Sequence, residues 1–453
     1  MSATGRGRPA GIRYAVILVG VLLVAMFGAA VVGSLHRDTV GLYNLAGLLF
    51  VGVVAAHTYL VVWIYRRYQE DGRQRHLLLL VATAALGVLL LVWLSVVAGV
   101  MTLTNFPEYV AALPFTLGAL WVVRNLQVNR KEPWKVVLLT IAWGMMIAPD
   151  LAILAETAYS TLLGDSLIPG IGAGVAQAIS PAVFEEGGKG LAVVLLFLLF
   201  RNEFDDVVSG IVLGALVGLG FNFLETGQYV AMAFQDAGLA GAIVQLGYRQ
   251  VLGLLTGHVA YTALIGAGIG VARQQRVPWR KAVTIASGFL VAIAAHFVWD
   301  LVAMTGLFPS SEDPLVDFLI VTPLQYLVLD GTFALMAVTL LVPGLRQERS
   351  ALEVELRAEV GTGLGAVTEP ELPWLLRPRR RVAVRWRTLW RRGVRDWLWL
   401  HRLQDAQLTL AMERWHRRRQ EVDEPVEAEH RLRQRVLELK RAGKENRMTW
   451  RTS

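Results

Sequence analysis

The chain of 453 residues is 55% hydrophobic and only 18% charged, with a mean hydropathy of +0.48, whereas soluble domains average about 25% charged residues. This composition excludes a simple soluble enzyme. The chain contains no cysteine, which excludes disulfides, zinc–thiolate sites, iron–sulfur clusters and a cysteine nucleophile. The formal net charge of +8 comes from the C-terminal part, because residues 344–453 hold 25 Lys and Arg against 16 Asp and Glu, and the rest holds 19 against 20.

Long apolar runs predict an all-α polytopic membrane protein with about ten transmembrane helices, since roughly 20 mostly apolar residues cross a hydrocarbon core of about 30 Å. The first run is too long for a signal peptide, so we expect it to remain as an anchor. The fourth is short and contains Pro114. The predicted spans are residues 14–34, 41–65, 77–104, 108–123, 136–155, 168–200, 207–231, 251–272, 282–303 and 315–342.

Basic residues fall almost entirely on one side of these spans. With the N-terminus inside, alternation places sixteen Lys and Arg on the cytoplasmic side and only Arg37 and Arg249 outside. Because positively charged short loops stay in the cytoplasm, we expect both termini there. The arginine-rich, lysine-poor composition is typical of a GC-rich bacterial source, so the predicted location is the bacterial cytoplasmic (inner) membrane.

The composition changes after Pro343, where a helical cytoplasmic tail is predicted. Between Arg377 and Arg419, arginines interleave with tryptophans at helical spacing. Such a helix suits an anionic lipid surface, where indole rings lie at the headgroup level and guanidinium groups meet phosphate. A helix partner or a solvated charged helix are alternatives, and no nucleic acid is expected because no recognisable module is present. The tryptophans are Trp386, Trp390, Trp397, Trp399 and Trp415.

Ionisable side chains inside the spans are candidates for a functional site, because a charge at the bilayer centre costs at least about 2.5 kcal/mol. Helical rise places all of the strongest candidates in the central to outer half of the bilayer. Carboxylates and imidazoles together can deprotonate a water and stabilise an oxyanion, as hydrolysis requires. The candidates are Glu185 and Glu186 in the sixth span, Glu225 in the seventh, His258 in the eighth, and His296 with Asp300 in the ninth.

Helical spacing makes these groups coherent, since residues four apart share a face. Lys189 can therefore neutralise Glu185, and Asp300 can orient the imidazole of His296. Pro181 and the Gly187-Gly188 pair predict a weakened helix around the acids.

Other polar or small residues in the spans have a simpler interpretation. Isolated polar side chains often hydrogen-bond between membrane helices, and glycines four apart let helices approach closely. We assign the first role to His57, Asp150, Gln177 and Asp330, and the second to Gly210, Gly214 and Gly218.

The order of short motifs resembles the PrsW family of intramembrane proteases, which are related to CAAX-processing and bacteriocin-immunity membrane proteases. The motifs are Glu-Glu-x-x-Lys-Gly at 185–190, Glu-Phe-Asp-Asp at 203–206, Gly-x-Gly-Phe-x-Phe-x-Glu at 218–225, Gly-His at 257–258 and His-x-x-x-Asp at 296–300. With Pro114 and the Glu132-Pro133-Trp134 loop, the resemblance runs from about residue 110 to about 305. The chain departs from the family in Gly187-Gly188 and in Thr226-Gly227 after the second acid. The predicted organisation is three accessory spans in 1–106, a PrsW-like core in 107–343 and the tail in 344–453.

The resemblance implies cleavage of a membrane-anchored protein, in the best-known branch an anti-sigma factor cut on its extracytoplasmic side. Carried over by position, the catalytic residues would be Glu185, Glu186, Glu225, His258, His296 and Asp300. Two mechanisms stay open. In one, Glu225, His258 and His296 hold a zinc ion (Zn²⁺) and Glu185 deprotonates the bound water. In the other, Glu185 activates water without a metal.

Two readings from other classes remain alternatives. A secondary transporter or proton pathway also places acids and histidines in mid-membrane, but we find no repeat in the sequence. A non-catalytic scaffold could use the same polar cluster to bind a membrane partner.

Overall fold

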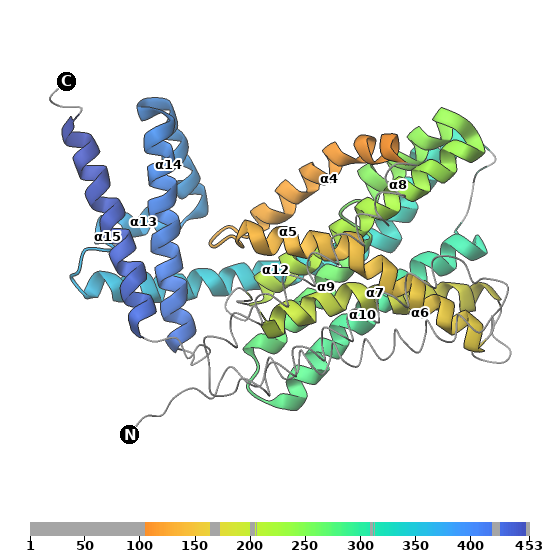
Figure 1. Ribbon diagram of the computed structural model, residues 1–453, viewed down its shortest axis with the longest axis horizontal. Helices are drawn as coiled ribbons and strands as arrows, with labels where there is room; N and C mark the ends of the chain where they lie inside the picture. The colour runs from red at the N-terminus through yellow and green to blue at the C-terminus, as the bar shows by residue number, and fades with distance from the viewer. Residues whose placement is uncertain are drawn as a thin grey trace, which may run out of the picture. The chain divides into compact units, whose positions relative to one another are not determined.

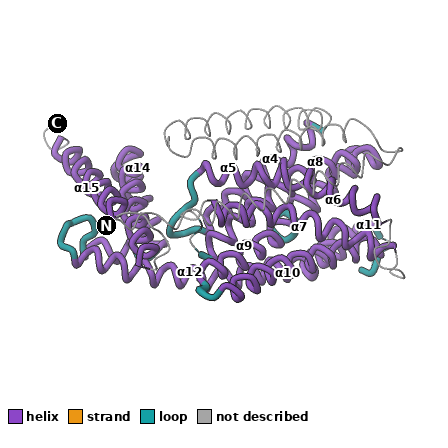
Figure 2. Tube along the Cα trace, turned by 60° about the horizontal axis from the view of Figure 1, so that its bottom comes forward, coloured by secondary structure: helices purple, strands orange, loops and turns teal. Residues whose placement is uncertain are grey.

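The computed structural model describes residues 105–163, 173–199, 204, 206–308, 311, 313–418 and 426–449. All regular structure in these residues is helical, and no strand occurs among them (Figures 1 and 2). The all-α prediction is therefore confirmed for this part of the chain. The predicted spans 14–34, 41–65 and 77–104, with His57, lie outside the described residues.

The helices follow one another in the order that Figure 1 shows. They are α4 (Phe106–Leu126), α5 (Trp134–Ala142), η1 (Trp143–Ile147), α6 (Ala148–Leu163), α7 (Ala173–Leu199), α8 (Val207–Gly247), η2 (Tyr248–Leu252), α9 (His258–Gln274), α10 (Pro278–Thr305), α11 (Pro314–Val316), η3 (Asp317–Val321), α12 (Thr322–Gly361), η4 (Glu369–Glu371), α13 (Leu372–Leu375), α14 (Pro378–Arg418) and α15 (Val426–Thr449).

Five helical stretches of the described part are long and apolar enough to cross a membrane. They are Phe106–Leu126, Trp134–Ile153, Val207–Leu252, Pro278–Thr305 and Asp317–Gly361. Helix α7 is not among them because Glu185, Glu186 and Lys189 interrupt its apolar stretch, and α9 has only 17 residues. A total of ten spans thus stays a prediction.

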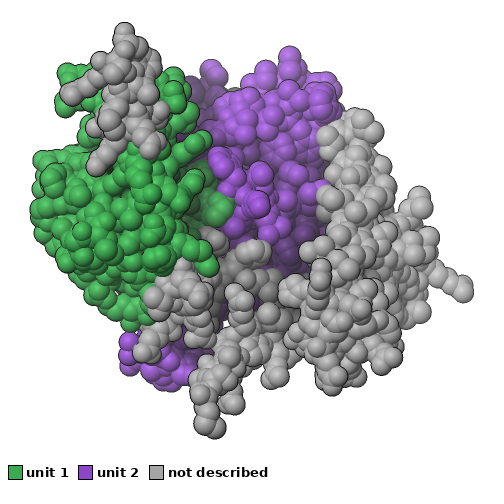
Figure 3. Space-filling view, turned by 60° about the vertical axis from the view of Figure 1, so that its left-hand side comes forward, with its two compact units in different colours: residues 1–9, 124–133, 339–453 green, residues 10–123, 134–338 purple. Residues whose placement is uncertain are grey.

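The chain divides into two compact units (Figure 3). The larger, here called the core unit, comprises residues 10–123 and 134–338, and the smaller, the tail unit, comprises residues 1–9, 124–133 and 339–453. The tail unit includes the loop 124–133 between α4 and α5, whereas the predicted tail comprises only residues 344–453.

Glycines bring α8 directly against α9 in the core unit. A Cβ added at Gly214 would overlap the carbonyl of Thr262, and one at Gly218 would overlap the carbonyl of His258. Gly210 abuts α9 in the same way. The predicted packing role of these glycines is confirmed, and the close approach fixes the backbone of His258 against α8.

Helix α8 begins at a capping box and contains, near its C-terminal end, a reversal that the sequence did not predict. The Asp206 carboxylate accepts bonds from the backbone N–H of Val208 at 2.8 Å and Ser209 at 3.2 Å, which satisfies two N-terminal donors. Nine residues before the end of α8, Gly238 has a φ of +64°, which glycine adopts without steric cost. The following segment, 239–252, packs back on the first part of α8, where Gln250 in η2 donates to the Thr226 hydroxyl at 2.8 Å.

Helix α7 does not show the predicted weakening around the acid pair. It is helical from Ala173 to Leu199, through Pro181 and both central glycines. Gly188 instead allows close packing: a Cβ there would lie 3.0 Å from the Ala148 carbonyl. The indole N–H of Trp143 donates to the Gly188 carbonyl at 3.2 Å, so the glycine holds α7 against η1 and α6.

The tail unit has its own apolar core and ionic network. Leu356, Leu375 and Leu408 are fully or almost fully buried in it. Beside this core, Glu359 accepts bonds from Arg414 at 2.6 Å and from Arg433 at 2.6 Å. Such a core shows that the tail is more than a surface helix.

Only some of the tail tryptophans remain available to a lipid surface. Trp415 is buried in the apolar core, and Trp399 donates its indole N–H to the Leu439 carbonyl at 2.7 Å. Trp386 and Trp390 are exposed. The expectation that the whole tryptophan series faces lipid is therefore wrong for Trp415 and Trp399, because these two side chains pack α14 against its neighbours.

The glycine contact between α8 and α9 yields a matched test. We expect Gly214→Ala to lower the melting temperature of the detergent-solubilised protein, because overpacking at a backbone contact costs about 1–3 kcal/mol. Gly118→Ala, in α4 with no atom within 4 Å of its added Cβ, should leave the melting temperature unchanged or raise it, as alanine favours a helix by up to about 1 kcal/mol. Equal effects of the two substitutions would contradict the packing role.

Candidate active site

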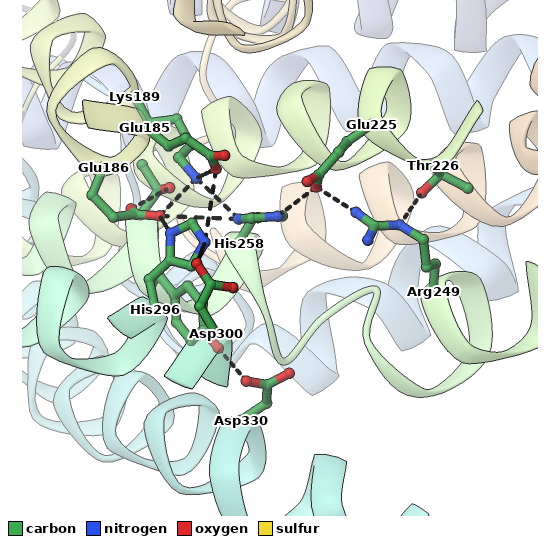
Figure 4. A network of polar contacts seen from close by, with 12 residues as sticks. Glu185, Glu186, Lys189, Glu225, Thr226, Arg249, His258, His296, Asp300 and Asp330 are labelled. Atoms are coloured by element: carbon green, nitrogen blue, oxygen red, sulfur yellow. Dashed lines mark hydrogen bonds and ion pairs between the residues drawn. The ribbon is translucent and has the colours of Figure 1, made fainter. Parts of the chain in front are cut away.

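Six side chains singled out by the sequence lie together in the core unit. Figure 4 shows them turned toward one another from α7, α8, α9 and α10. They are Glu185, Glu186, Glu225, His258, His296 and Asp300. None of the six predicted residues is placed elsewhere.

The two neighbouring acids of α7 have different surroundings. The side chain of Glu186 is fully buried, whereas that of Glu185 keeps 14% of its surface exposed. Lys189, also fully buried, lies 2.6 Å from Glu186 and 3.3 Å from Glu185. A charge without a partner at such depth is strongly destabilising, so the lysine allows both carboxylates to stay ionised. Its ammonium also lies 4.0 Å from the ring centroid of Phe221, a cation–π contact.

His296 is oriented by carboxylates on both ring nitrogens. Its Nδ1 lies 3.1 Å from Glu186, and its Nε2 lies 3.4 Å from Asp300 and 3.8 Å from Glu185. The predicted pairing with Asp300 is thus present, and Glu186 provides a second partner from α7. Nε2 is the nitrogen that faces the partly exposed acids.

His258 stands at the N-terminus of α9, where it links the acid pair to Glu225. Its Nδ1 lies 2.9 Å from the Lys189 ammonium, and its Nε2 lies 2.6 Å from the Glu225 carboxylate. The ring packs edge-on against Phe221, with 5.0 Å between centroids. Phe221, the first phenylalanine of the Gly-x-Gly-Phe-x-Phe-x-Glu motif, therefore contacts both the buried lysine and this imidazole.

Arg249 also belongs to the cluster, although the sequence did not predict it. Its guanidinium forms an ion pair with Glu225, donates to the Thr226 hydroxyl at 3.3 Å and stacks on the Tyr229 ring. In an uninterrupted helix, the 24 residues between Glu225 and Arg249 would span about 36 Å, so the contact depends on the reversal at Gly238. The sequence feature that could have pointed to Arg249 is that it is one of only two basic residues predicted on the outer side of the membrane.

A pocket opens beside the two histidines. Asn222, Arg249, His258, Tyr261, His296 and Asp330 are among the residues that line it. The Tyr261 hydroxyl donates to the Asp330 carboxylate, which joins α9 to α12 and agrees with the helix–helix role predicted for Asp330. Gln177, by contrast, is exposed, so its predicted helix contact is not seen.

Three of the side chains can hold a metal ion. Glu185, His258 and His296 each offer a ligand atom, and these atoms all lie within 4.8 Å of one another. Two imidazoles, one carboxylate and an open position suit catalytic zinc, and carboxylates on the outer ring nitrogens are the usual orienting contacts. An ion at Nδ1 of His258 would replace the contact with Lys189. The sequence predicted Glu225 as the third ligand, but its carboxylate pairs with Arg249, and Glu185 completes this group instead.

Comparison with known proteins agrees with this geometry. Residues 132–328 match the PrsW family intramembrane metalloproteases. The matched region contains all six predicted site residues, so the predicted resemblance to PrsW is confirmed there. No curated protein and no solved structure is similar enough to match. Together with the long apolar helices, the match indicates an integral membrane protein in which residues 132–328 are similar to the PrsW family.

Arg249 provides a prediction for the arrangement of this site. We expect Arg249→Gln to lower proteolytic activity by about 10- to 100-fold, the usual effect of losing a group that orients a catalytic residue. Without the guanidinium, Glu225 loses the partner that holds its carboxylate beside His258. The rate of substrate cleavage in proteoliposomes would measure the effect, with Arg276→Gln, an exposed arginine after α9, as control. Full activity of Arg249→Gln would show that Glu225 needs no such support.

Proposed function

We propose that this protein is an intramembrane endopeptidase that hydrolyses a peptide bond in a membrane-anchored protein. The observation that carries the proposal is the meeting of Glu185, His258 and His296 from three different helices, with ligand atoms within 4.8 Å of one another. A hydrogen bond that only joins two helices needs two polar groups, so the meeting of three such groups favours a site over a structural contact. The PrsW match of residues 132–328 supports peptide hydrolysis as the reaction.

The different burial of the two neighbouring acids suggests their roles. Glu185 keeps some exposed surface and can approach a water and a substrate carbonyl. Glu186 is enclosed by Lys189, His296 and the hydroxyl of Thr262, which lies 3.5 Å away. We therefore assign proton transfer from water to Glu185, and the positioning of His296 to Glu186.

The histidines would stabilise the negative charge that develops on the substrate. An imidazole N–H directed at the scissile carbonyl stabilises the oxyanion that forms when water attacks. His296 is suited to this role because its Nε2 faces Glu185, the acid that would hold the water, at 3.8 Å. Asp300 stabilises the charged form of this ring from the next turn of α10.

A divalent cation fits the same donor set. Zinc held by Glu185, His258 and His296 would acidify a water and polarise the scissile carbonyl. Glu185 would then serve as a ligand in place of its role as the base. Glu186 and Glu225 would then orient the two histidines through their remaining ring nitrogens, as both acids already contact them.

The proposed substrate class follows from the membrane context. Acids and histidines inside apolar helices can reach only a peptide segment that enters the membrane or lies at its surface. A single-span protein of the anti-sigma-factor kind is the substrate that the family resemblance favours, with cleavage in the outer half of the membrane.

The acid–base role of Glu185 gives the main test of the proposal. We expect Glu185→Gln, which keeps the side-chain shape, to slow cleavage by about 10²- to 10⁴-fold, the range for loss of a general base. His258→Ala should also abolish most cleavage. Quantitative proteomics of membranes from cells with the native or the Glu185→Gln protein would reveal the uncut substrate.

Asp236→Asn serves as the matched control, because it also converts an acid to an amide but lies at an exposed position of α8. It should cleave at the native rate. Undiminished cleavage by Glu185→Gln or by His258→Ala would refute the protease assignment. A scaffold or transporter would show no accumulating substrate in either variant.

The metal site has a test that does not depend on cleavage. If the active form binds zinc, the purified protein should contain about one zinc ion per chain, and His296→Ala should lose it, because a zinc site with only two protein ligands is weak. Elemental analysis measures the metal, and a chelator should lower activity until zinc is restored. A metal-free protein with undiminished activity would instead leave Glu185 as a base acting without an ion.

A further inference from the structure

The first part of α14 is strongly basic. Between Arg377 and Arg395 the chain contains nine arginines and no acidic residue. Such a run repels itself unless anions approach it. It is therefore the strongest cationic segment of the described tail unit.

Two of these arginines have a structural role inside the tail unit. Arg381 is buried and donates to the Leu375 and Val128 carbonyls, each at 2.6 Å. Burial lowers the pKa of Arg381 to about 10, so it stays charged at neutral pH. Arg385 donates to Gln404 at 2.5 Å and to Asp405 at 3.2 Å. The other seven are exposed, namely Arg377, Arg379, Arg380, Arg387, Arg391, Arg392 and Arg395.

The chain reverses direction within α14 at Gly393. Its φ of +81° interrupts the helix, and Arg385 contacts Gln404 across the reversal. A continuous helix would separate these two residues by about 28 Å. The segment 378–418 is thus a helical hairpin, with Gly393 at its tip.

Exposed apolar side chains accompany the arginines toward this tip. Val382, Trp386 and Trp390 follow one another at intervals of four residues and so share one helix face. Their exposed fractions are 49%, 53% and 82%, and Val394, just after Gly393, is 61% exposed. We call Val382, Trp386, Trp390 and Val394, with the seven exposed arginines, the hairpin surface.

We propose that the hairpin surface binds the headgroup region of an anionic membrane. Tryptophan and valine side chains would enter the interface, while the arginines meet lipid phosphates. Each arginine near an anionic leaflet favours binding by about 1 kcal/mol, roughly fivefold. The proposal does not depend on the protease assignment.

Two observations favour lipid over nucleic acid. Half of the apolar positions are valines, which fill a lipid interface but offer no flat ring on which a base can stack. In addition, α12 lies within a candidate membrane span and continues into the tail unit. The hairpin surface is therefore tied to a membrane at high effective concentration.

The absence of cysteine makes a site-specific test of the full chain straightforward. A nitroxide attached to Val394→Cys would report its surroundings in nanodiscs of phosphatidylcholine alone or with phosphatidylglycerol. We expect oxygen accessibility to rise several-fold relative to a water-soluble nickel reagent when phosphatidylglycerol is present. The matched probe at Glu438→Cys, an exposed position on α15, should show no change.

Variants separate the two parts of the hairpin surface. In the labelled protein, Trp386→Ala combined with Trp390→Ala should abolish the rise in oxygen accessibility. Arg387→Gln combined with Arg391→Gln should make this rise disappear at a lower salt concentration than in the native sequence, since salt screens the remaining charges. Both pairs are exposed, so folding should be retained, which the Glu438→Cys probe also checks. A Val394 probe that stays equally accessible to nickel in both kinds of disc would overturn the proposal. Protection by added single-stranded RNA, but not by anionic lipid, would overturn it in favour of nucleic acid.

Discussion

The buried ion pair between Lys189 and Glu186 is the interaction on which the site depends. Both side chains are fully buried, and their charged atoms lie 2.6 Å apart. A single charge in this position would become neutral or destabilise the fold. With both present, the lysine can also contact Glu185 and Nδ1 of His258, so one cation organises groups from α7 and α9. The acids can therefore remain carboxylates among apolar helices.

Close helix packing turns this electrostatic arrangement into a fixed geometry. Gly218 places the α8 backbone against the carbonyl of His258, and Gly188 holds α7 against the helices before it. A side chain longer than hydrogen at Gly218 would separate α8 from α9, which carry Glu225 and His258, and one at Gly188 would shift α7, which carries the acid pair. Hydrogen bonds between groups only 2.6–3.1 Å apart, such as those of His258 and His296, would not survive such a separation. The glycines therefore contribute to the site although they carry no functional group.

The sequence predicted the residues of the site better than their individual roles. Motif order and the cost of intramembrane charge were sufficient to identify Glu185, Glu225, His258 and His296, because ionisable residues in apolar helices stand out. Arg249 did not stand out, since it reaches Glu225 only through a reversal that one positive-φ glycine, Gly238, makes possible. The tail shows the same difference: tryptophan–arginine periodicity predicted helix, but only tertiary packing determines that Trp415 is buried.

The exposed fractions within the cluster suggest from which side a peptide would approach. Glu186 and Lys189 are fully buried and His296 is 4% exposed, whereas Glu185, Asp300 and Glu225 are 14%, 16% and 17% exposed. The fully buried Glu186 and Lys189 hold other groups in place, whereas the partly exposed carboxylates also carry oxygens that have room for water. Asp300 and Glu225 contact the two histidines as well. A peptide that reached Glu185 would thus also meet His258, which is 12% exposed, before the more deeply buried His296. The same fold excludes water from the groups that must stay fixed and admits it where it would react.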